Sequence, residues 1–425
     1  MTRRLSICYA VPGHYLLPEV GPTRNVLSVA EALSQVADVT LAFRRVVSPV
    51  ESVPYAIVEL DPEGNVPCSF VDDSAVRGTK LNDFLRYLLA LKKFADHHSA
   101  HFDIVLEKSW LLSGYLTHAF QKHGIPGVLV ENLVRIHKEP PHNLKGLNKY
   151  FRHCLSQAIV RHYARKAPVI IAETDELKAA ITDLWGIAGS RVEVAGLGVD
   201  SRLFRPTDQK LARRELGIDP AVTVLLYVGV LDQCHNLGPV IDALSRLHSP
   251  GVQLHIVGDG ILRKAFEEQA LRSTAPVFFH GRVPHRAVQQ FIAAADLCLA
   301  PYEPQAFFDG KVSFATLKIP EYMACARPVV SVPSGHILRL VQDGVTGFLF
   351  PNDTGNWIEF LRFFPDRDRL RQMGLAAERS VMNQTWETTA QRYLQACEKI
   401  LVERNAQRLE AVVGDNVGEV PFDAK

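Results

Sequence analysis

The stretch that decides the fold is Lys311–Val332, which reads KVSFATLKIPEYMACARPVVSV. Its first half is a loop, and Pro320 marks the start of a short helix because proline is tolerated only in the first turn of a helix. The apolar run Pro328–Val332 follows at once and predicts a buried strand. Loop, helix and strand in this order form the repeating unit of parallel sheets covered by helices.

The same alternation runs along most of the chain in two series. The first series of predicted strands is Leu5–Val11, Asp38–Phe43, Asp103–Glu107, Gly127–Glu131, Val169–Ala172 and Arg191–Ala195. The second series is Val222–Gly229, Val252–Val257, Val277–His280, Leu297–Ala300, Pro328–Val332 and Phe348–Phe350. Because the alternation restarts after Gly198–Pro206, the sequence predicts an α/β protein with two separate sheets and a linker between them.

This pattern divides the chain into four parts. We expect an N-terminal domain over residues 1–203 and a C-terminal domain over residues 204–384. Residues 385–409 are expected to form a helix that returns to the first domain, because Tyr393, Ala396 and Ile400 fall on one face of an amphipathic pattern. Residues 410–425 have little periodicity and are predicted to form a flexible tail.

Composition excludes several classes of protein. The chain has 425 residues, 47% of them apolar and 22% charged, which is typical of a soluble globular protein. A net charge of +1 leaves no global field for a nucleic-acid backbone, so no nucleic-acid partner is expected. The longest apolar runs are too short to span a membrane. Seven scattered cysteines without a C-x-x-C pair predict reduced thiols and a cytoplasmic location.

Metal and nucleotide signatures are mostly absent. The sequence contains no G-x-x-x-x-G-K-[ST], and Gly258-Asp259-Gly260 lacks the third glycine of a dinucleotide fingerprint. The only D-x-D, Asp366-Arg367-Asp368, lies in a helical pattern, and the histidines near His97 show no convincing ligand spacing. The sequence therefore predicts no metal site and no cofactor.

Lys318 and Glu321 lie at the start of the helix that Pro320 marks. Free backbone N–H groups and the helix dipole favour a phosphate there, and Lys318 adds a positive charge. The carboxylate of Glu321 can accept hydrogen bonds from the two hydroxyls of a ribose. Alternatively, Glu321 only complements the helix dipole.

Seven motifs occur in an order and spacing that resemble the retaining glycosyltransferases of family 4, which have the GT-B fold. They are GVDSRLFRP (198–206), LLYVGVL followed by HN (225–236), LHIVGDG (254–260), FHGRVP (279–284), AADLCLAP (294–301), KIPEYMACARPVV (318–330) and DGVTGFLFP (343–351). The resemblance implies two Rossmann-like domains facing a cleft. A nucleotide-sugar would be held mainly by the C-terminal domain and an acceptor mainly by the N-terminal domain.

The resemblance also implies roles for individual residues. The main chain at Arg282 and Val283 would contact the base, Glu321 the ribose, and Gly229, His235 and Lys318 the diphosphate. Gly21 would let the N-terminal loop approach the donor. The full set expected at the donor is Gly21, Arg24, Gly229, Val230, His235, Gly258, Arg282, Val283, Lys311, Lys318, Ile319 and Glu321. Lys318, Glu131 and His235 are expected to be catalytic.

The chain also departs from the family pattern. Val230 and His235 stand where the family usually has arginine and lysine, so less charge faces the departing diphosphate. Ser313 replaces the first glutamate of the E-x7-E pattern, and Glu131-Asn132 replaces a common histidine. Lys318, with Arg24 or Lys311, would then supply the missing charge. Glu131 could hold sugar hydroxyls, stabilise positive charge at the anomeric carbon, or cap the following helix.

The expected function is metal-independent transfer of a hexosyl group, with retention, from a UDP- or GDP-sugar to the hydroxyl of a small-molecule or glycan acceptor. The alternatives are a nucleotide-sugar 2-epimerase of the same fold and a non-catalytic subunit that binds sugar nucleotides. The segment 143–166 is basic, and residues 140–172 contain no acidic residue. This segment would suit peripheral membrane contact or an anionic acceptor, and it could equally be a solvated helix face.

Overall fold

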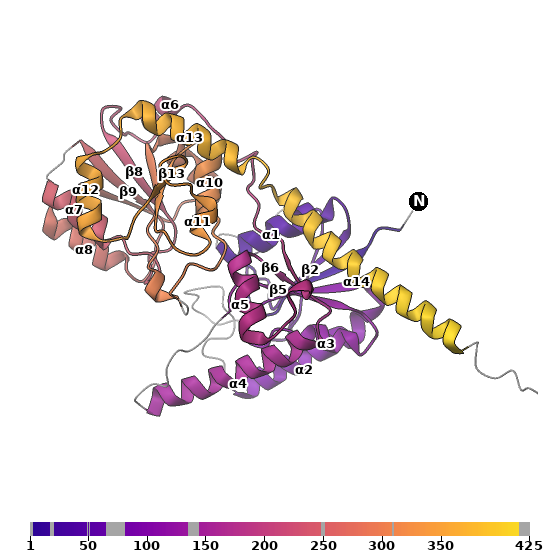
Figure 1. The fold of residues 1–425 in the computed structure, drawn as a ribbon. Helices are drawn as coiled ribbons and strands as arrows, with labels where there is room; N and C mark the ends of the chain where they lie inside the picture. The colour runs from indigo at the N-terminus through magenta and orange to yellow at the C-terminus, as the bar shows by residue number, and fades with distance from the viewer. Residues whose placement is uncertain are drawn as a thin grey trace, which may run out of the picture.

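The computed structural model describes residues 3–17, 21–48, 50, 52–64, 81–134, 144–247, 251–307 and 310–415. These residues form two parallel sheets, each flanked by helices (Figure 1). The N-terminal sheet has seven strands in the order β3-β2-β1-β4-β5-β6-β7. The C-terminal sheet has six strands in the order β10-β9-β8-β11-β12-β13. This arrangement is the GT-B fold that the sequence motifs imply.

The N-terminal sheet confirms the first predicted series of strands and adds one. Its strands are β1 (Ser6–Val11), β2 (Asp38–Phe43), β3 (Ala56–Glu59), β4 (Ile104–Lys108), β5 (Gly127–Glu131), β6 (Val169–Ala172) and β7 (Val192–Val194). The helices around it are α1 (Gly21–Ser34), α2 (Leu81–His98), α3 (Tyr115–Gln121), α4 (Leu144–Lys166) and α5 (Asp175–Trp185). The sequence analysis did not predict β3, a short edge strand that is only half-buried.

The C-terminal sheet follows the second predicted series. Its strands are β8 (Thr223–Val228), β9 (Val252–Val257), β10 (Val277–Gly281), β11 (Leu297–Ala300), β12 (Val329–Ser331) and β13 (Gly347–Leu349). Its helices are α6 (Gln209–Glu215), α7 (Gly238–Leu247), α8 (Arg263–Ser273), α9 (His285–Ala294), α10 (Lys318–Ala324), α11 (Ile337–Leu340), α12 (Thr354–Arg362) and α13 (Arg367–Val381). Asp366 of the D-x-D caps α13 by accepting a hydrogen bond from the Arg369 N–H at 2.8 Å.

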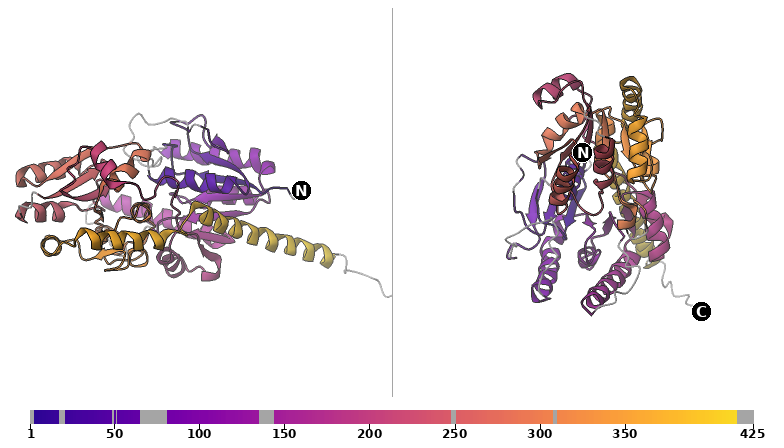
Figure 2. Two further views of the ribbon diagram at one scale, coloured as in Figure 1. Left: turned by 90° about the horizontal axis from the view of Figure 1, so that it is seen from above. Right: turned by 90° about the vertical axis from the view of Figure 1, so that its left-hand side faces the viewer.

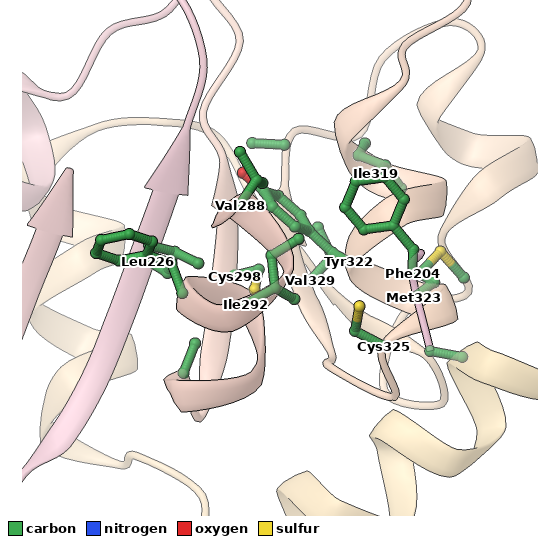
Figure 3. Packing of buried hydrophobic residues seen from close by; sticks show 14 of the residues in the cluster. Phe204, Leu226, Val288, Ile292, Cys298, Ile319, Tyr322, Met323, Cys325 and Val329 are labelled. Carbon is green, nitrogen blue, oxygen red and sulfur yellow. The ribbon is translucent and has the colours of Figure 1, made fainter. Parts of the chain in front are cut away.

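Helix α10 is anchored by the hydrophobic core on one face of the C-terminal sheet. Ile319, Tyr322 and Met323 are fully buried and pack with residues of α9 and β11, as Figure 3 shows. The Tyr322 hydroxyl also accepts a hydrogen bond of 2.8 Å from the Val228 N–H at the end of β8. Apolar burial and this bond together fix the start of α10 beside the carboxyl end of β8.

The chain crosses between the domains twice. Val199 of the first crossing pairs with Thr385 of the second, and the Val199 N–H donates to the Gln384 carbonyl at 2.8 Å. Helix α14 (Trp386–Asp415) then runs along the N-terminal domain, as Figures 1 and 2 show. Its buried face, which includes Tyr393 and Ile400, joins the core around α1 and β1. The helix includes residues 410–415, where the sequence predicts a tail, and residues 416–425 lie outside the described residues.

Direct contacts also join the two domains. The Thr174 hydroxyl, at the start of α5, donates to the Ser313 carbonyl at 2.6 Å. The Glu176 carboxylate contacts Arg339 at 2.7 Å and His336 at 3.2 Å, both from the C-terminal domain. Beside these contacts lies a cavity of about 260 Å³ lined by both domains and by Arg392 of α14.

Candidate active site

Three successive strands of the C-terminal sheet end in glycines with positive φ. Gly229 has φ 151°, Gly258 has φ 136° and Gly281 has φ 70°. The turns pack on one another, since a Cβ on Gly258 would collide with the Gly229 carbonyl. Only glycine combines this backbone conformation with so close an approach. The result is a floor of main-chain atoms at the carboxyl ends of β8, β9 and β10, where open α/β sheets bind their ligands.

Lys318 stands beside this floor, at the start of α10. Its Nζ lies 3.3 Å from the Tyr227 hydroxyl and 4.5 and 5.3 Å from the centres of the Tyr227 and Tyr302 rings. A Cβ on Gly229 would lie 2.8 Å from the same Nζ. Burial of the ammonium group lowers the pKa of Lys318 to about 7, although Asp232 and Glu321 oppose this shift. The protonated fraction of Lys318 at pH 7 therefore depends on the charge of any group that binds beside it.

His235 and Val230 occupy the places where the family resemblance implies cations. His235 Nδ1 lies 2.8 Å from the Asp232 carboxylate, and its ring contacts the Tyr302 ring at 5.0 Å. Burial lowers the pKa of His235 to about 4, with the Lys318 charge acting in the same direction. The side chain is therefore neutral at pH 7. Val230 is 57% exposed, and its carbonyl accepts a hydrogen bond of 2.7 Å from the Tyr227 hydroxyl.

Glu321 lies in the first turn of α10 with only 14% of its side chain exposed. Its Oε1 is 3.5 Å from His285 Nε2, at the start of α9. Arg282 is exposed and Val283 is half-buried, directly after β10. The strand ends thus bring Glu321 and the Arg282–Val283 main chain toward one edge of the glycine floor.

Two other expected donor contacts are placed differently. The Ile319 side chain is fully buried in the core, so only its main chain remains for a ligand. Lys311 is exposed, in the loop before α10.

The N-terminal domain contributes two residues of the expected set. Gly21 is the first residue of α1, where a loop was expected. Arg24 lies in the first turn of the same helix, and its Nε is buried with no hydrogen-bond partner among the described residues. A buried guanidinium N–H needs an acceptor. Arg24 is therefore a candidate partner for an anionic ligand.

Glu131, at the end of β5, is 2% exposed, and its Oε1 has no hydrogen-bond partner among the described residues. Burial raises the pKa of its carboxyl to about 8, and the neighbouring Glu107 acts in the same direction. Glu131 is thus protonated at pH 7 and can donate a hydrogen bond. This state suits contact with a sugar hydroxyl better than stabilisation of a positive anomeric carbon. Residues 132–134 are not helical, so Glu131 caps no helix within the described part of the chain.

Glu131 has a charged pair beside it that the sequence did not reveal. Lys108, at the end of β4, donates a hydrogen bond of 2.6 Å to Glu173, which follows β6. Asn25 donates to the same carboxylate oxygen at 3.1 Å. All three side chains are buried. Only the pairing order of the strands brings them together, and no local motif marks them.

Tyr227 and Tyr302 are the other site residues that the sequence analysis missed. Each is fully buried or nearly so, and each reaches Lys318 with its ring. A signal exists for Tyr227, which stands two residues before the glycine that ends β8. Strand periodicity places it on the same face of the sheet as Gly229.

Within the described residues, no group of three or more His, Cys, Asp or Glu side chains could hold a metal ion. None of the described helices is long and apolar enough to cross a membrane.

Comparison with known proteins is consistent with this geometry. Residues 222–362, which include β8 to β13 and α10, match the sequence model of the family Glycosyl transferases group 1. The C-terminal domain is thus similar in sequence to the group 1 glycosyltransferases. Among the relatives of the chain are the D-inositol 3-phosphate glycosyltransferases of Mycobacterium tuberculosis and Mycobacterium bovis, which are 28% identical over 333 residues. The match covers 75% of this chain and 66% of each relative.

Solved structures agree with the GT-B fold of this chain. Sucrose-phosphate synthase from Thermosynechococcus elongatus superposes with a TM-score of 0.74 and 18% identity, over 94% of this chain and all of that one. HepE of Anabaena in complex with UDP superposes with a TM-score of 0.69 and 18% identity, over 93% of this chain and 100% of that one. At these identities the likeness establishes the fold alone.

Proposed function

We propose that this protein is a group 1 glycosyltransferase that transfers a hexosyl group from a UDP- or GDP-sugar to an acceptor hydroxyl, with retention of configuration and without a metal ion. The observation that carries the proposal is the approach of the Lys318 ammonium group to the Gly229 turn, where a Cβ would lie 2.8 Å from Nζ. A buried ammonium group beside a main-chain floor suits a diphosphate. Two of the HepE structures with this fold are complexes with UDP and with UDP-glucose, which makes UDP-glucose the first donor to test.

The donor would lie across the ends of β8, β9 and β10. In this placement Lys318 and Arg24 neutralise the diphosphate, Glu321 accepts hydrogen bonds from the ribose, and the main chain at Arg282 and Val283 meets the base. Charge then accumulates on the leaving diphosphate in the transition state, where fixed positive groups are most effective. Neutral His235 contributes shape and hydrogen bonding rather than charge at pH 7.

The acceptor would enter from the N-terminal domain. Protonated Glu131 is proposed to donate a hydrogen bond to a hydroxyl of the transferred sugar or of the acceptor. The relatives named for D-inositol 3-phosphate make that compound the first acceptor for a test panel. The basic residues of α1 and α4 would suit an anionic acceptor of this kind.

The deciding experiment incubates the purified protein with UDP-glucose and GDP-mannose, each with and without acceptors, and analyses the products. Acceptor-dependent release of nucleotide together with an α-linked product from an α-linked donor would support retaining transfer. Epimerised nucleotide-sugar without release would identify the 2-epimerase. Binding of nucleotide-sugar without any turnover across the acceptor panel would favour the non-catalytic subunit.

The basic segment 143–166 corresponds to helix α4, and we propose that its outer face contacts an anionic bilayer. Phe151 and Leu155 are each 63% exposed on this face, and the exposed Arg161 and Arg165 follow them about three turns later. Apolar side chains beside cationic ones suit the membrane interface. Co-sedimentation with phosphatidylglycerol vesicles tests the contact. Loss of binding in Phe151→Asp would support it, and equal binding to phosphatidylcholine vesicles would contradict it.

A further inference from the structure

Lys318 is surrounded by buried tyrosines whose hydroxyls are themselves hydrogen-bonded, which a contact with a diphosphate alone does not require. The Tyr227 hydroxyl accepts a hydrogen bond from Lys318 Nζ at 3.3 Å and donates one to the Val230 carbonyl at 2.7 Å. One buried hydroxyl thus connects the ammonium group with the main chain of the turn after β8. The neighbouring Tyr302 is held in turn by Thr316, whose hydroxyl oxygen lies 2.5 Å from the Tyr302 hydroxyl.

The ammonium group has aromatic rather than anionic neighbours. Both tyrosine rings lie within about 6 Å of Lys318 Nζ, the range of cation–π attraction. The charged and titratable groups that face it are Asp232, Cys234 and His235 from the segment after β8, Tyr302 after β11, and Glu321 on α10 itself. None of the described carboxylates lies within ion-pair distance of Lys318 Nζ, so no full counter-charge holds the proton there.

We infer that Tyr227 is a positioning residue of the donor site, which acts through Lys318 so that the arriving diphosphate supplies the counter-charge and solvent supplies the proton that completes the cation. This inference rests on the proposed function, because it requires an anionic donor beside Lys318. When the donor binds, one proton passes from solvent to the neutral amine of Lys318.

Donor binding and protonation of Lys318 are thermodynamically linked, so the direction of proton exchange on binding can be measured. Burial lowers the pKa of free Lys318 to about 7, so about half of the molecules carry a neutral amine at pH 7. A bound diphosphate raises that pKa, and the complex therefore takes up protons. The diphosphate of a nucleotide-sugar is esterified at both ends and does not titrate near pH 7, so it adds no proton exchange of its own.

The first experiment uses the unmodified protein. UDP-glucose is titrated calorimetrically at pH 7.0 in buffers of different ionisation enthalpy, and the slope gives the number of protons exchanged. We expect an uptake of about 0.5 proton at pH 7.0 and close to none at pH 5.5. Lys318→Arg, which stays charged, should bind without uptake at either pH. Binding with no proton uptake at pH 7.0, or uptake that persists in Lys318→Arg, would overturn the inference.

The second experiment separates positioning from stability. Tyr227→Phe keeps the ring but removes the acceptor for the ammonium group, so the affinity for UDP-glucose should fall about threefold to tenfold at pH 7. The loss should shrink toward pH 5.5, because the amine is then protonated in the variant as well. The KM for the donor should rise by more than kcat falls.

Tyr322→Phe is the matched control. It also removes a buried tyrosine hydroxyl bonded to the end of β8, but the Tyr322 hydroxyl bonds Val228 and not Lys318. Its pH dependence of donor affinity should match that of the parent. An equal loss of donor affinity at every pH in Tyr227→Phe would contradict a positioning role. The same pH-dependent loss of affinity in Tyr322→Phe would contradict it as well.

If the folded parent binds neither UDP-glucose nor GDP-mannose, the proposed function fails and this inference fails with it. Donor binding without proton uptake refutes the inference alone.

Discussion

The hydroxyl of Thr174 donates a hydrogen bond of 2.6 Å to the carbonyl of Ser313, and this bond joins the two domains. Thr174 also caps α5, because its oxygen accepts a hydrogen bond from the Leu177 N–H at 3.0 Å. Ser313 lies in the loop that leads to Lys318 and stands where the family pattern has its first glutamate. The helix cap of one domain is therefore bonded to the loop of the other domain that leads to Lys318.

This relationship predicts that the adjacent ion pair controls how the domains close. Glu176→Ala removes contacts with both Arg339 and His336, and should raise the radius of gyration of the free protein in small-angle scattering. Asp175→Ala is the control, since its pair with Arg339 spans 3.7 Å between side chains that are each more than half exposed. It should scatter as the parent does. An unchanged radius in Glu176→Ala would show that other contacts hold the domains.

Glu321→Ala should weaken UDP binding strongly with little loss of fold. The change removes a charged acceptor for two ribose hydroxyls, a contact worth about 1.5–3 kcal/mol. Calorimetric titration with UDP measures the effect. Glu267→Ala removes a carboxylate paired with Arg263 on α8 of the same domain, and should leave the affinity unchanged. Equal affinities in Glu321→Ala and the parent would exclude the ribose contact.

Lys318→Ala should lower turnover more than His235→Ala at pH 7. Lys318 retains about half of its charge there, whereas His235, with a pKa of about 4, has almost none. The charge of His235 contributes only below about pH 5. Turnover measured from pH 5 to pH 9 tests the order. If His235→Ala is inactive at every pH while Lys318→Ala matches the parent, the diphosphate binds elsewhere.

Val230→Arg tests whether the arginine that the family usually has can be restored. Val230 is 57% exposed, so a longer side chain can be accommodated there without entering the core. The added charge should raise turnover by stabilising the leaving group. Val230→Gln provides the matched length without the charge. Equal rates for the two variants would show that positive charge at this position is not limiting.

Glu131→Gln should keep most of the activity at pH 7, whereas Glu131→Ala should lose it. The carboxyl, whose pKa burial raises to about 8, is protonated at pH 7, and the amide reproduces its hydrogen-bond donor. The raised pKa also predicts stability: the folded state binds the proton more tightly than the unfolded state, so stability falls as pH rises from about 4.5 to about 8.

Melting temperatures of the Glu131→Gln variant and the parent at pH 5 and pH 8 check this sign. The amide does not ionise, so the parent should lose stability relative to Glu131→Gln at the higher pH. A constant difference across this range would mean that Glu131 ionises normally in the folded protein.

Activity should survive an excess of chelator. No described cluster of ligands stands near the diphosphate position, and Asp366 of the only D-x-D caps a helix instead. Assays with and without EDTA, followed by addition of Mg²⁺ or Mn²⁺, measure this directly. Loss of turnover with EDTA and its recovery with either ion would require a metal-dependent mechanism.

The sequence by itself determined the two α/β sheets, because short runs rich in apolar residues alternate with helical patterns along both halves of the chain. It also marked Lys318 and Glu321, which lie three residues apart at a helix start that Pro320 identifies. Local signals fixed these features, so no tertiary contact was needed to find them. The sequence analysis missed β3, an edge strand that is only half-buried.

Only the tertiary structure decided the protonation states of the site residues. Burial between Tyr227 and Tyr302 lowers the pKa of Lys318 to about 7, and burial beside Glu107 raises the pKa of Glu131 to about 8. Tyr302 and Glu107 are distant in sequence from the residues they affect. A pKa depends on every group that excludes water or brings charge within a few ångströms, and chain folding alone determines which groups those are.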